Sequence, residues 1–419
     1  MEEDQPVKYS VADMALAPEG KRKISWATSY MPVLGMLKRK HAPQKPLSGM
    51  KIATCLHLEA KTACLLQVLS ELGAEVTAAG SNPLSTQDDV CAALAESGVG
   101  VYSHRGMSAS EYAEHLDSAV SIGPDIVIDD GADMVVLLHE KRTDLMKSVR
   151  GGSEETTTGV KRLKAMEKDG VLKFPMIAVN DAKSKFLFDN RYGTGQSVLD
   201  GFMRTTNVLV AGKVVVVAGY GWCGRGVASR ASGMGARVLV VETDPHRALE
   251  ALMDGHDISD MQHASAVGDI FFTLTGNTGV IRKEHFALMK DGVILGNAGH
   301  FDVEVSRSDL EEMARETTND RPNVLTYHME NGNRIHLLGE GRLVNLAAGD
   351  GHPVEIMDLS FALQLESALY MAGNTLKPGV YAVPEATDKA VVEAKLQSLG
   401  LVIEKLTPQQ VEYMDSWRE

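Results

Sequence analysis

The chain has 419 residues, of which 44% are hydrophobic, and a formal net charge of −14 at pH 7. This length allows two or three domains with large buried cores, and the acidic balance, without a basic stripe that carries aromatic residues, argues against a nucleic-acid partner. No apolar run approaches the roughly 20 residues that a membrane helix needs, and the chain opens Met-Glu-Glu-Asp without a basic and then apolar region, so we expect a cytoplasmic protein with no membrane partner.

The first part of the chain predicts a polar tail followed by a parallel-sheet domain. Residues 1–23 are polar and mixed in charge, which predicts a loosely held tail. Strand and helix patterns then alternate from residue 50 onward. The strand patterns lie at residues 51–55, 75–79, 99–103, 125–130 and 176–179, and helix patterns lie at 65–72 and 90–96. Such alternation is typical of a parallel sheet covered by helices.

A second alternating series begins at residue 213 and includes apolar strand patterns at 270–273 and 293–295. We therefore expect two doubly wound units in one chain, each with its site at the carboxyl ends of its strands. Residues 354–371 have a helical pattern, and the last segment, about 388–419, is helical and charged. The four cysteines, at 55, 64, 91 and 223, show neither the density of a disulfide scaffold nor paired metal-ligand spacing, so we expect reduced thiols and no metal.

A glycine fingerprint follows the first strand pattern of the second unit, at Gly219, Gly221 and Gly224. In a dinucleotide-binding turn, the first glycine permits the tight turn, the second lets backbone N–H groups approach the pyrophosphate, and the third lets the next helix pack closely. Glu242 ends the next strand pattern, where a carboxylate can accept both ribose hydroxyls and repel a 2′-phosphate. The pattern predicts bound NAD rather than NADP; the alternative is a glycine-rich turn in a domain without a cofactor.

Polar residues collect where strands of the first unit end. His57 follows one strand pattern, Asp130 closes another and Asn180 follows a third. Because a parallel sheet opens its site at that edge, these side chains predict a shared pocket. Each of them alone could instead be a turn former or a structural residue.

Two further segments offer groups for this pocket. Residues 153–159, Ser-Glu-Glu-Thr-Thr-Thr-Gly, place hydroxyls beside two carboxylates, as a rigid set of donors or as a helix N-cap. Lys185 precedes Asp189 by one helical turn in an apolar segment. Burial there would lower the pKa of the lysine and let it act as a base; a helical ion pair with Asp189 is the alternative.

Longer motifs extend over about residues 24 to 417. They are Cys-Leu-His at 55–57, Gly-Ser-Asn-Pro-Leu-Ser-Thr-Gln-Asp-Asp at 80–89, Asp-Asp-Gly at 129–131, the run at 153–159, Asp-Asn at 189–190, Gly-Tyr-Gly-Trp-Cys-Gly at 219–224, Gly-His-Phe-Asp-Val-Glu at 299–304 and Glu-Gly-Arg-Leu-Val-Asn at 340–345. In these motifs the chain resembles the S-adenosylhomocysteine hydrolase family.

The resemblance implies an α/β fold with two doubly wound parallel-sheet (Rossmann-like) domains, the NAD domain being inserted into a split substrate domain, and a short C-terminal helical extension. The expected parts are the tail at 1–23, the first part of the substrate domain at 24–190, the NAD domain at 191–350, the second part of the substrate domain at 351–387 and an oligomerisation segment at 388–419. Self-association is also implied, as a homotetramer or a dimer.

The family's reaction, which the resemblance implies here, is the reversible hydrolysis of S-adenosyl-L-homocysteine to homocysteine and adenosine. NAD oxidises the ribose 3′ carbon, and the resulting ketone acidifies the C4′ proton. A base then removes that proton, homocysteine thiolate leaves, water adds, and the cofactor returns the hydride. NAD should therefore stay bound and be recycled.

The resemblance also assigns roles to individual residues. Lys185 and Asp189 are assigned to the 3′ hydroxyl, with Lys185 as its base and Glu155 beside them on the ribose. His57 and Asp130 are assigned to the 5′ end, His300 to the substrate and the nicotinamide, and His352 to the purine edge. The residues assigned to NAD are Thr156, Thr157, Thr158, Asn190, Gly219, Gly221, Gly224, Glu242, Asn277, Asn297, His300 and Asn345.

The chain departs from the familiar bacterial and eukaryotic members of this family. It ends without their Lys-Pro-Asp-His-Tyr-Arg-Tyr tail, which reaches a neighbour's NAD. The resemblance therefore does not extend to this contact between subunits. At the two positions that the resemblance places against the purine, the chain has Glu59 and Lys61, and before the Gly-His pair it has Asp350 instead of an apolar residue. This pattern looks like the archaeal and thermophilic branch, where some relatives act on S-inosyl-L-homocysteine. An ammonium at Lys61 would suit the O6 acceptor of hypoxanthine. The alternative is that Lys61 lies in solvent and does not contact the base.

Two other functions compete with hydrolysis. An NAD-dependent dehydrogenase would also pair two α/β units around the cofactor, but it would release NADH to solvent. A catalytically silent NAD-binding regulator is the second, and the retained Lys185, Asp189, Asp130 and His57 argue against it.

Overall fold

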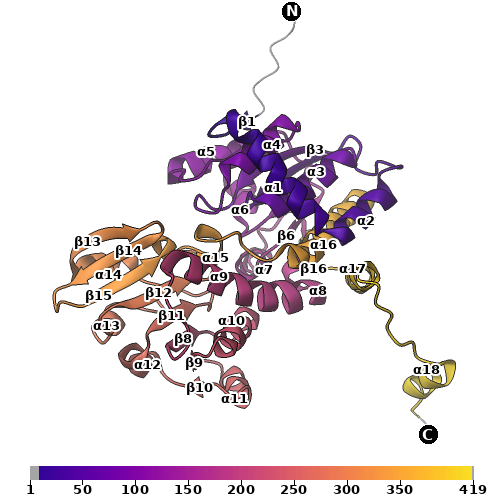
Figure 1. The fold of residues 1–419 in the computed structure, drawn as a ribbon. Coiled ribbons are helices and arrows are strands. Elements are labelled where there is room, and N and C mark those ends of the chain that lie inside the picture. The colour runs from indigo at the N-terminus through magenta and orange to yellow at the C-terminus, as the bar shows by residue number, and fades with distance from the viewer. Residues whose placement is uncertain (1–8, 418–419) are drawn as a thin grey trace, which may run out of the picture.

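The computed structural model describes residues 9–417 and contains two eight-stranded sheets, each covered by helices (Figure 1). The first sheet has the order β1-β4-β3-β2-β5-β6-β7-β16, and its neighbouring strands are parallel. Its strands are β1 (Tyr9–Ser10), β2 (Lys51–Leu56), β3 (Glu75–Gly80), β4 (Gly100–Tyr102), β5 (Ile126–Asp129), β6 (Gly151–Glu154), β7 (Pro175–Ala178) and β16 (Gly379–Ala382).

The second sheet has the order β10-β9-β8-β11-β12-β15-β14-β13. It is parallel from β10 to β15, and β15, β14 and β13 then form an antiparallel edge. Its strands are β8 (Val214–Ala218), β9 (Arg237–Val241), β10 (Asp257–Ile258), β11 (Ile270–Thr273), β12 (Val293–Asn297), β13 (Ala314–Arg321), β14 (Val324–Met329) and β15 (Arg334–Leu338). The prediction of an α/β fold with two parallel-sheet units is confirmed.

Helices cover both sheets and bury their apolar faces. In the first domain, Ile52 of β2 belongs to the same apolar cluster as Leu65 and Phe361 from two helices. The helices are α1 (Ala17–Ser29), α2 (Pro32–His41), α3 (Ala60–Glu71), α4 (Asp88–Glu96), α5 (Ala109–Val120), α6 (Asp133–Glu140), α7 (Thr157–Lys168), α8 (Lys183–Lys185), α9 (Thr194–Thr206), α10 (Trp222–Gly233), α11 (Pro245–Met253), α12 (Met261–Val267), α13 (Lys283–Phe286), α14 (Arg307–Met313), α15 (Val344–Ala347), α16 (Val354–Gly373), α17 (Glu385–Ser398) and α18 (Pro408–Asp415). No helix within residues 9–417 has the length and apolar character to cross a membrane.

Residues 9–23, predicted as part of a loosely held tail, are instead packed into the first domain. β1 pairs with β4, and Ala17 at the start of α1 is 2% exposed. A Cβ at Gly20 would lie 1.9 Å from the backbone oxygen of Asp89, so this glycine lets α1 touch α4. The prediction was wrong because the acidic residues at 2–4 and the basic run at 21–23 outweighed the apolar residues between them. Residues 1–8 of the predicted tail lie outside the described residues.

The chain returns to the first sheet after it completes the second. β16 pairs in parallel with β7, which supports the proposed insertion of the NAD domain into a split first domain. The proposed boundary at residue 387 falls inside α17, where Asp388 accepts hydrogen bonds from the backbone of Lys183 and Ser184. The exposed part of the C-terminal extension therefore starts after α17, and Figure 1 shows α18 well away from both domains.

Candidate active site

A cavity of about 720 Å³ lies between the two domains, at the carboxyl ends of their strands. The strand order reverses between β2 and β5 in the first sheet and between β8 and β11 in the second. Loops diverge at such switch points and leave a crevice for ligands. The residues that follow β2, β5 and β6 line this cavity from one side, and those that follow β8, β9, β11 and β12 line it from the other. One crevice can therefore hold a substrate against a cofactor.

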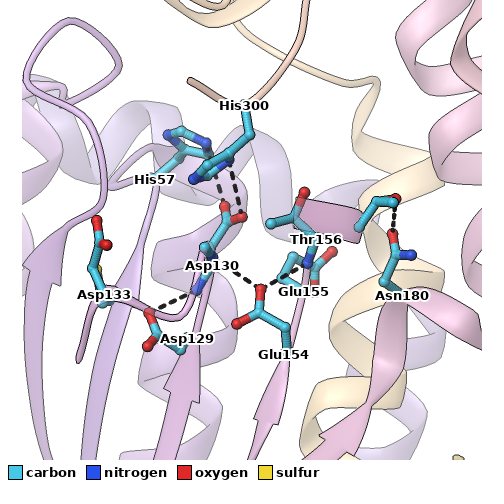
Figure 2. A network of polar contacts seen from close by, with 12 residues as sticks. His57, Asp129, Asp130, Asp133, Glu154, Glu155, Thr156, Asn180 and His300 are labelled. Carbon is cyan, nitrogen blue, oxygen red and sulfur yellow. Dashed lines mark hydrogen bonds and ion pairs between the residues drawn. The ribbon is translucent and has the colours of Figure 1, made fainter. Parts of the chain in front are cut away.

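Three residues from both domains form one end of the site, which we call the histidine cluster: His57, Asp130 and His300. Nε2 of His57 lies 3.3 Å from Oδ2 of Asp130, and Nδ1 of His300 lies 3.6 Å from Oδ1. Figure 2 shows both rings directed at this carboxylate. The ligand atoms of the three residues lie within 4.8 Å of one another, a spacing that could also hold a metal ion, although the sequence predicts none.

His57 is neutral in this environment. Burial lowers the pKa of His57 to about 4, and the carboxylate of Asp130 offsets only part of that effect. The hydroxyl of Ser85 lies 2.6 Å from Nδ1 and orients the ring. A neutral imidazole at pH 7 can accept a proton, so His57 has the state that a general base requires.

A second group, the lysine cluster, consists of Lys185, Glu155 and Asp189. Nζ of Lys185 lies 3.4 Å from Oε1 of Glu155 and 3.4 Å from Oδ1 of Asp189, and it donates to Oδ1 of Asn190 at 2.9 Å. The π-helix η3 (Phe186–Gly193) carries Asp189 and Asn190. A π-helical turn is wider than an α-helical one and often occurs at functional sites. Here it presents two polar side chains beside one ammonium.

The lysine cluster contradicts the prediction that the pKa of Lys185 is depressed. Burial alone would lower this pKa, but the carboxylates of Asp189 and Glu155 outweigh burial and raise it. Burial raises the pKa of Glu155 to about 7, and Lys185 opposes that shift only in part. The ion pair with Asp189, the alternative considered for Lys185, is present. Glu155 rather than Lys185 therefore changes its protonation near neutral pH.

Glu59 and Lys61 form a buried ion pair on the wall of the cavity. Nζ of Lys61 lies 2.8 Å from Oε2 of Glu59 and donates to the backbone oxygen of Asp350 at 2.6 Å. Glu59 is the N-cap of α3 with an extended backbone, so its side chain folds back over the first turn and meets Lys61. Lys61 is 5% exposed, and the alternative of a solvated lysine is therefore wrong.

Asp350 lies away from the predicted purine site, whereas His352 lines the cavity as predicted for a substrate-binding residue. The carboxylate of Asp350 pairs at 2.7 Å with Arg204, and its side chain is 75% exposed, so it points to solvent rather than into the cavity. Nδ1 of His352 lies 2.7 Å from Oδ1 of Asp189, and Nε2 lies 3.2 Å from the hydroxyl of Thr194. His352 therefore lines the cavity beside the lysine cluster.

The glycine loop after β8 has the shape of a phosphate cradle. Gly219 has a φ of 99°, which favours glycine. The nearest atom to a Cβ at Gly221 would be 3.9 Å away, so the loop is open towards the cavity there. Gly221 is the N-cap of α10 and makes no side-chain cap, which leaves the N–H groups of that helix end for a ligand. Glu242 lines the cavity and accepts from the backbone N–H of Tyr220 at 2.7 Å.

Asn345 provides a second feature that fits a cofactor. Its Nδ2 donates to the hydroxyl of Ser197 at 3.2 Å, but its buried Oδ1 has no hydrogen-bond partner among residues 9–417. A buried amide oxygen without a donor has a cost that a bound group can remove. This acceptor on the cavity wall suits a carboxamide such as that of nicotinamide.

The structure brings most of the residues predicted for NAD to one surface. The predicted residues that line the cavity are Thr156, Thr157, Thr158, Asn190, Gly219, Gly221, Glu242, Asn277, His300 and Asn345. Gly224 lies behind the loop, where a Cβ would come 1.9 Å from the oxygen of Gly219, in agreement with its predicted role in packing. Asn297 does not line the cavity: it is buried, and its Nδ2 donates to the backbone oxygens of Gly299, Phe301 and Gly341. It holds the loop of His300 instead.

Two residues that support the site, Ser360 and Gln364, were not predicted, and a third, Ser153, belongs to the predicted run at 153–159. Ser360 donates to Oδ2 of Asp189 at 2.6 Å, Gln364 donates to Oε2 of Glu155, and the hydroxyl of Ser153 donates to Gln364. Ser360 and Gln364 lie on α16, which is part of the first domain although it follows the second in sequence. Polar residues inside a long apolar helix were the only available signal.

Comparisons with known proteins agree with this site. The model of the S-adenosyl-L-homocysteine hydrolase family matches residues 8–144, and that of its NAD binding domain matches residues 190–351. The chain is similar to an adenosylhomocysteinase of Thermococcus kodakarensis, with 59% identity over 411 residues and 98% of each chain covered. It is also similar to the S-inosyl-L-homocysteine hydrolases of Methanopyrus kandleri, 56% identical with 98% of each chain covered, and of Methanocaldococcus jannaschii, 54% identical with 98% of this chain and 99% of the relative covered.

Proposed function

The chain belongs to the S-adenosyl-L-homocysteine hydrolase family, whose NAD-binding domain it contains, and from this premise we propose how its own residues cleave a purine nucleoside thioether. The observation that carries the proposal is the single cavity in which the lysine cluster, the histidine cluster and the glycine loop meet. Bound NAD supplies a hydride acceptor for the ribose 3′ carbon and returns the hydride at the end of the cycle.

The lysine cluster is proposed to bind the 3′ end of the ribose. The ammonium of Lys185 donates to the 3′ oxygen, and Asp189 keeps that ammonium charged. The hydroxyl proton has to leave as the carbon is oxidised. Glu155, 3.4 Å from Nζ and with its pKa raised to about 7, can take up this proton at neutral pH. Lys185, assigned as the base on resemblance, then acts as one half of a Lys185–Glu155 pair.

The histidine cluster is proposed to act at the 5′ end, where homocysteine thiolate leaves and water adds. The neutral ring of His57 can accept a proton from the water as its oxygen attacks the 5′ carbon. Asp130 faces both histidines and holds their rings around the position of that carbon. His300 comes from the second domain and already faces Asp130 of the first, so the cluster needs both domains.

The purine is proposed to meet the Glu59–Lys61 pair. Adenine presents an N6 amine and an N1 acceptor, whereas hypoxanthine presents an O6 acceptor and an N1–H donor. Membership of the S-adenosyl-L-homocysteine hydrolase family favours S-adenosyl-L-homocysteine as substrate. The buried ammonium of Lys61 is the specific observation that favours S-inosyl-L-homocysteine as the second candidate, because it suits O6 and opposes the N6 amine.

The experiment that tests this function follows thiol release by the purified protein from each of the two thioethers, without added NAD. We expect homocysteine and a nucleoside in equal amounts from at least one of them. The reverse reaction, from nucleoside and homocysteine, should consume thiol. Absence of thiol release from both substrates, with NAD bound to the protein, would contradict the proposal.

We also propose that the protein acts in the cytoplasm as a homo-oligomer. The residues after α17 are proposed to form the contact between its subunits. In this segment Val402 is 95% exposed, Tyr413 is 69% exposed and Met414 is 70% exposed, a run of apolar surface that a second copy could cover. Light scattering of the full chain should give a dimer or a tetramer. Removal of residues 401–419 should lower the molar mass to that of a smaller species, and an unchanged mass would contradict a role for this segment.

A further inference from the structure

Glu154 is a buried carboxylate that none of the proposed steps uses. Its Oε1 accepts a hydrogen bond from the backbone N–H of Gly131 at 2.9 Å and another from that of Thr156 at 3.0 Å. Gly131 directly follows Asp130, and Thr156 directly follows Glu155. One oxygen therefore ties the turn after β5 to the turn after β6, as Figure 2 shows.

We propose that Glu154 is a positioning residue that sets the spacing between Asp130 at the 5′ end of the ribose and Glu155 at its 3′ end. The inference rests on the proposed function, which assigns those two ends. Glu154 acts through the turns, because it does not line the cavity, whereas Asp130 and Glu155 do.

The strand register explains why Glu154 is available for this role. Asp129 of β5 and Glu154 of β6 are partners across the parallel pair, so their carboxylates lie behind the two turns. Asp129 accepts from the backbone N–H of Asp130 at 3.0 Å and of Val135 at 2.9 Å. The N–H of Gly131 donates to Glu154 instead. Each carboxylate thus holds a different part of the turn.

The two ends of the site depend unequally on Glu154. The carboxylate of Glu155 has its own anchors in Lys185 and Gln364, and its backbone N–H donates to the oxygen of Asp129 at 2.9 Å. The Asp130 turn is also held by Asp129 and by Arg162, which donates to the backbone oxygen of Gly131, but it passes through Gly131, which has a φ of 112° and little intrinsic rigidity. Loss of Glu154 should therefore displace Asp130 more than Glu155, and the 5′ step should suffer more than the 3′ step.

Gly159 provides an independent way to move the same carboxylate. A Cβ at Gly159, in the first turn of α7, would lie 2.2 Å from Cδ of Glu154. The helix backbone is thus shaped around Glu154, and an alanine at 159 has to push the carboxylate away from the two N–H groups. Two substitutions at different positions should give the same selective defect.

The test separates the two steps in single turnovers of the NAD-loaded protein. Absorbance of the reduced nicotinamide reports the 3′ step, and thiol release reports the 5′ step. Glu154→Ala should slow thiol release by about tenfold or more and change cofactor reduction by less than about threefold. Glu154→Gln keeps an oxygen acceptor and should restore thiol release to within about threefold of wild type. Gly159→Ala should resemble Glu154→Ala, and the double variant should be no slower than either, because the second change has no carboxylate left to move.

Asp358→Ala is the matched control. Asp358 is also buried and accepts hydrogen bonds from two backbone N–H groups, those of Val33 and Leu34, but it does not line the cavity. It should lower the melting temperature without changing the ratio of the two rates. Equal loss of both rates in Glu154→Ala, an unchanged rate of thiol release, or additive effects in the double variant would overturn the inference. Absence of both signals in the wild type would instead contradict the proposed function.

Discussion

Nζ of Lys185 lies 3.4 Å from Oε1 of Glu155, and both side chains are almost completely buried. Burial favours a neutral lysine, yet this ammonium faces Glu155 and also Asp189, whose combined charge raises the pKa of Lys185. The pKa of Glu155, raised to about 7 by burial, is the one that falls near neutral pH. The lysine cluster therefore contains one fixed cation and one exchangeable proton.

Lys185→Ala should abolish both thiol release and cofactor reduction. Without the ammonium, the 3′ oxygen loses its donor and Glu155 loses its partner, and we expect a loss of at least about 10²-fold in the rate of reduction. Substrate binding should survive, as measured by equilibrium dialysis with labelled thioether. His57→Ala acts at the other end and should still reduce the cofactor. Reduction at an unchanged rate in Lys185→Ala would show that this cluster does not act at the 3′ hydroxyl.

Gly221→Ala should weaken NAD binding without affecting the fold. Its Cβ would meet no atom closer than 3.9 Å, so the free protein should melt normally, but the methyl group stands where the pyrophosphate approaches. We expect affinity to fall by about tenfold or more, or ~1.4 kcal/mol. Gly224→Ala is the contrasting control: its Cβ would lie 1.9 Å from the oxygen of Gly219, which should lower the melting temperature itself. Equal NAD affinity in Gly221→Ala and wild type would count against the cradle.

Lys61→Met should shift purine choice towards adenine. The substitution removes a buried cationic donor and keeps an apolar chain of similar length, so the ratio of kcat/KM for the inosyl over the adenosyl thioether should fall by about tenfold to a hundredfold. Asp350→Asn should leave that ratio unchanged, because the carboxylate pairs with Arg204 at the surface. A ratio that does not move in Lys61→Met, or equal wild-type efficiencies, would remove the idea that Lys61 selects the base.

His57 should make the free protein less stable as the pH falls from 6.5 to 4. The pKa of His57 is lowered from 6.5 to about 4 in the folded protein, so the unfolded chain binds more protons in that window. The contribution of His57 to the free energy of unfolding is fully present above pH 6.5 and decreases towards pH 4, by about 3 kcal/mol in total. The free energies of unfolding of wild type and His57→Gln, measured in urea, should therefore approach each other as the pH falls from 6.5 to 4. Parallel curves for the two proteins across this window would contradict a neutral, buried His57.

Local patterns accounted for the cofactor loop and for much of the site. The spacing of Gly219, Gly221 and Gly224 lies within one turn, and the strand before it is a short apolar run, so no tertiary information was needed. The rule that parallel strands expose polar residues at their carboxyl ends was enough to group His57 and Asp130.

What the sequence missed depends on contacts between distant segments. The pKa of Lys185 reflects burial, the carboxylate of Asp189 on η3 and that of Glu155, which follows the distant strand β6. The strand β6 has the sequence Gly-Gly-Ser-Glu and lacks the β-branched residues that mark a strand. Asp350 was expected against the purine because of its place beside a motif, but Arg204, far away in sequence, holds its carboxylate at the surface.

Counting turnovers per bound cofactor shows whether NAD stays bound and is recycled during thioether hydrolysis. Unbound cofactor is first removed from the protein, and the bound NAD is quantified after denaturation of a sample. Thiol release and reduced nicotinamide are then followed together through many turnovers without added NAD. We expect many thiols per bound NAD and no net reduced cofactor. Thiol release that stops after about one equivalent, or reduced nicotinamide that accumulates in step with product, would contradict this expectation and favour a dehydrogenase.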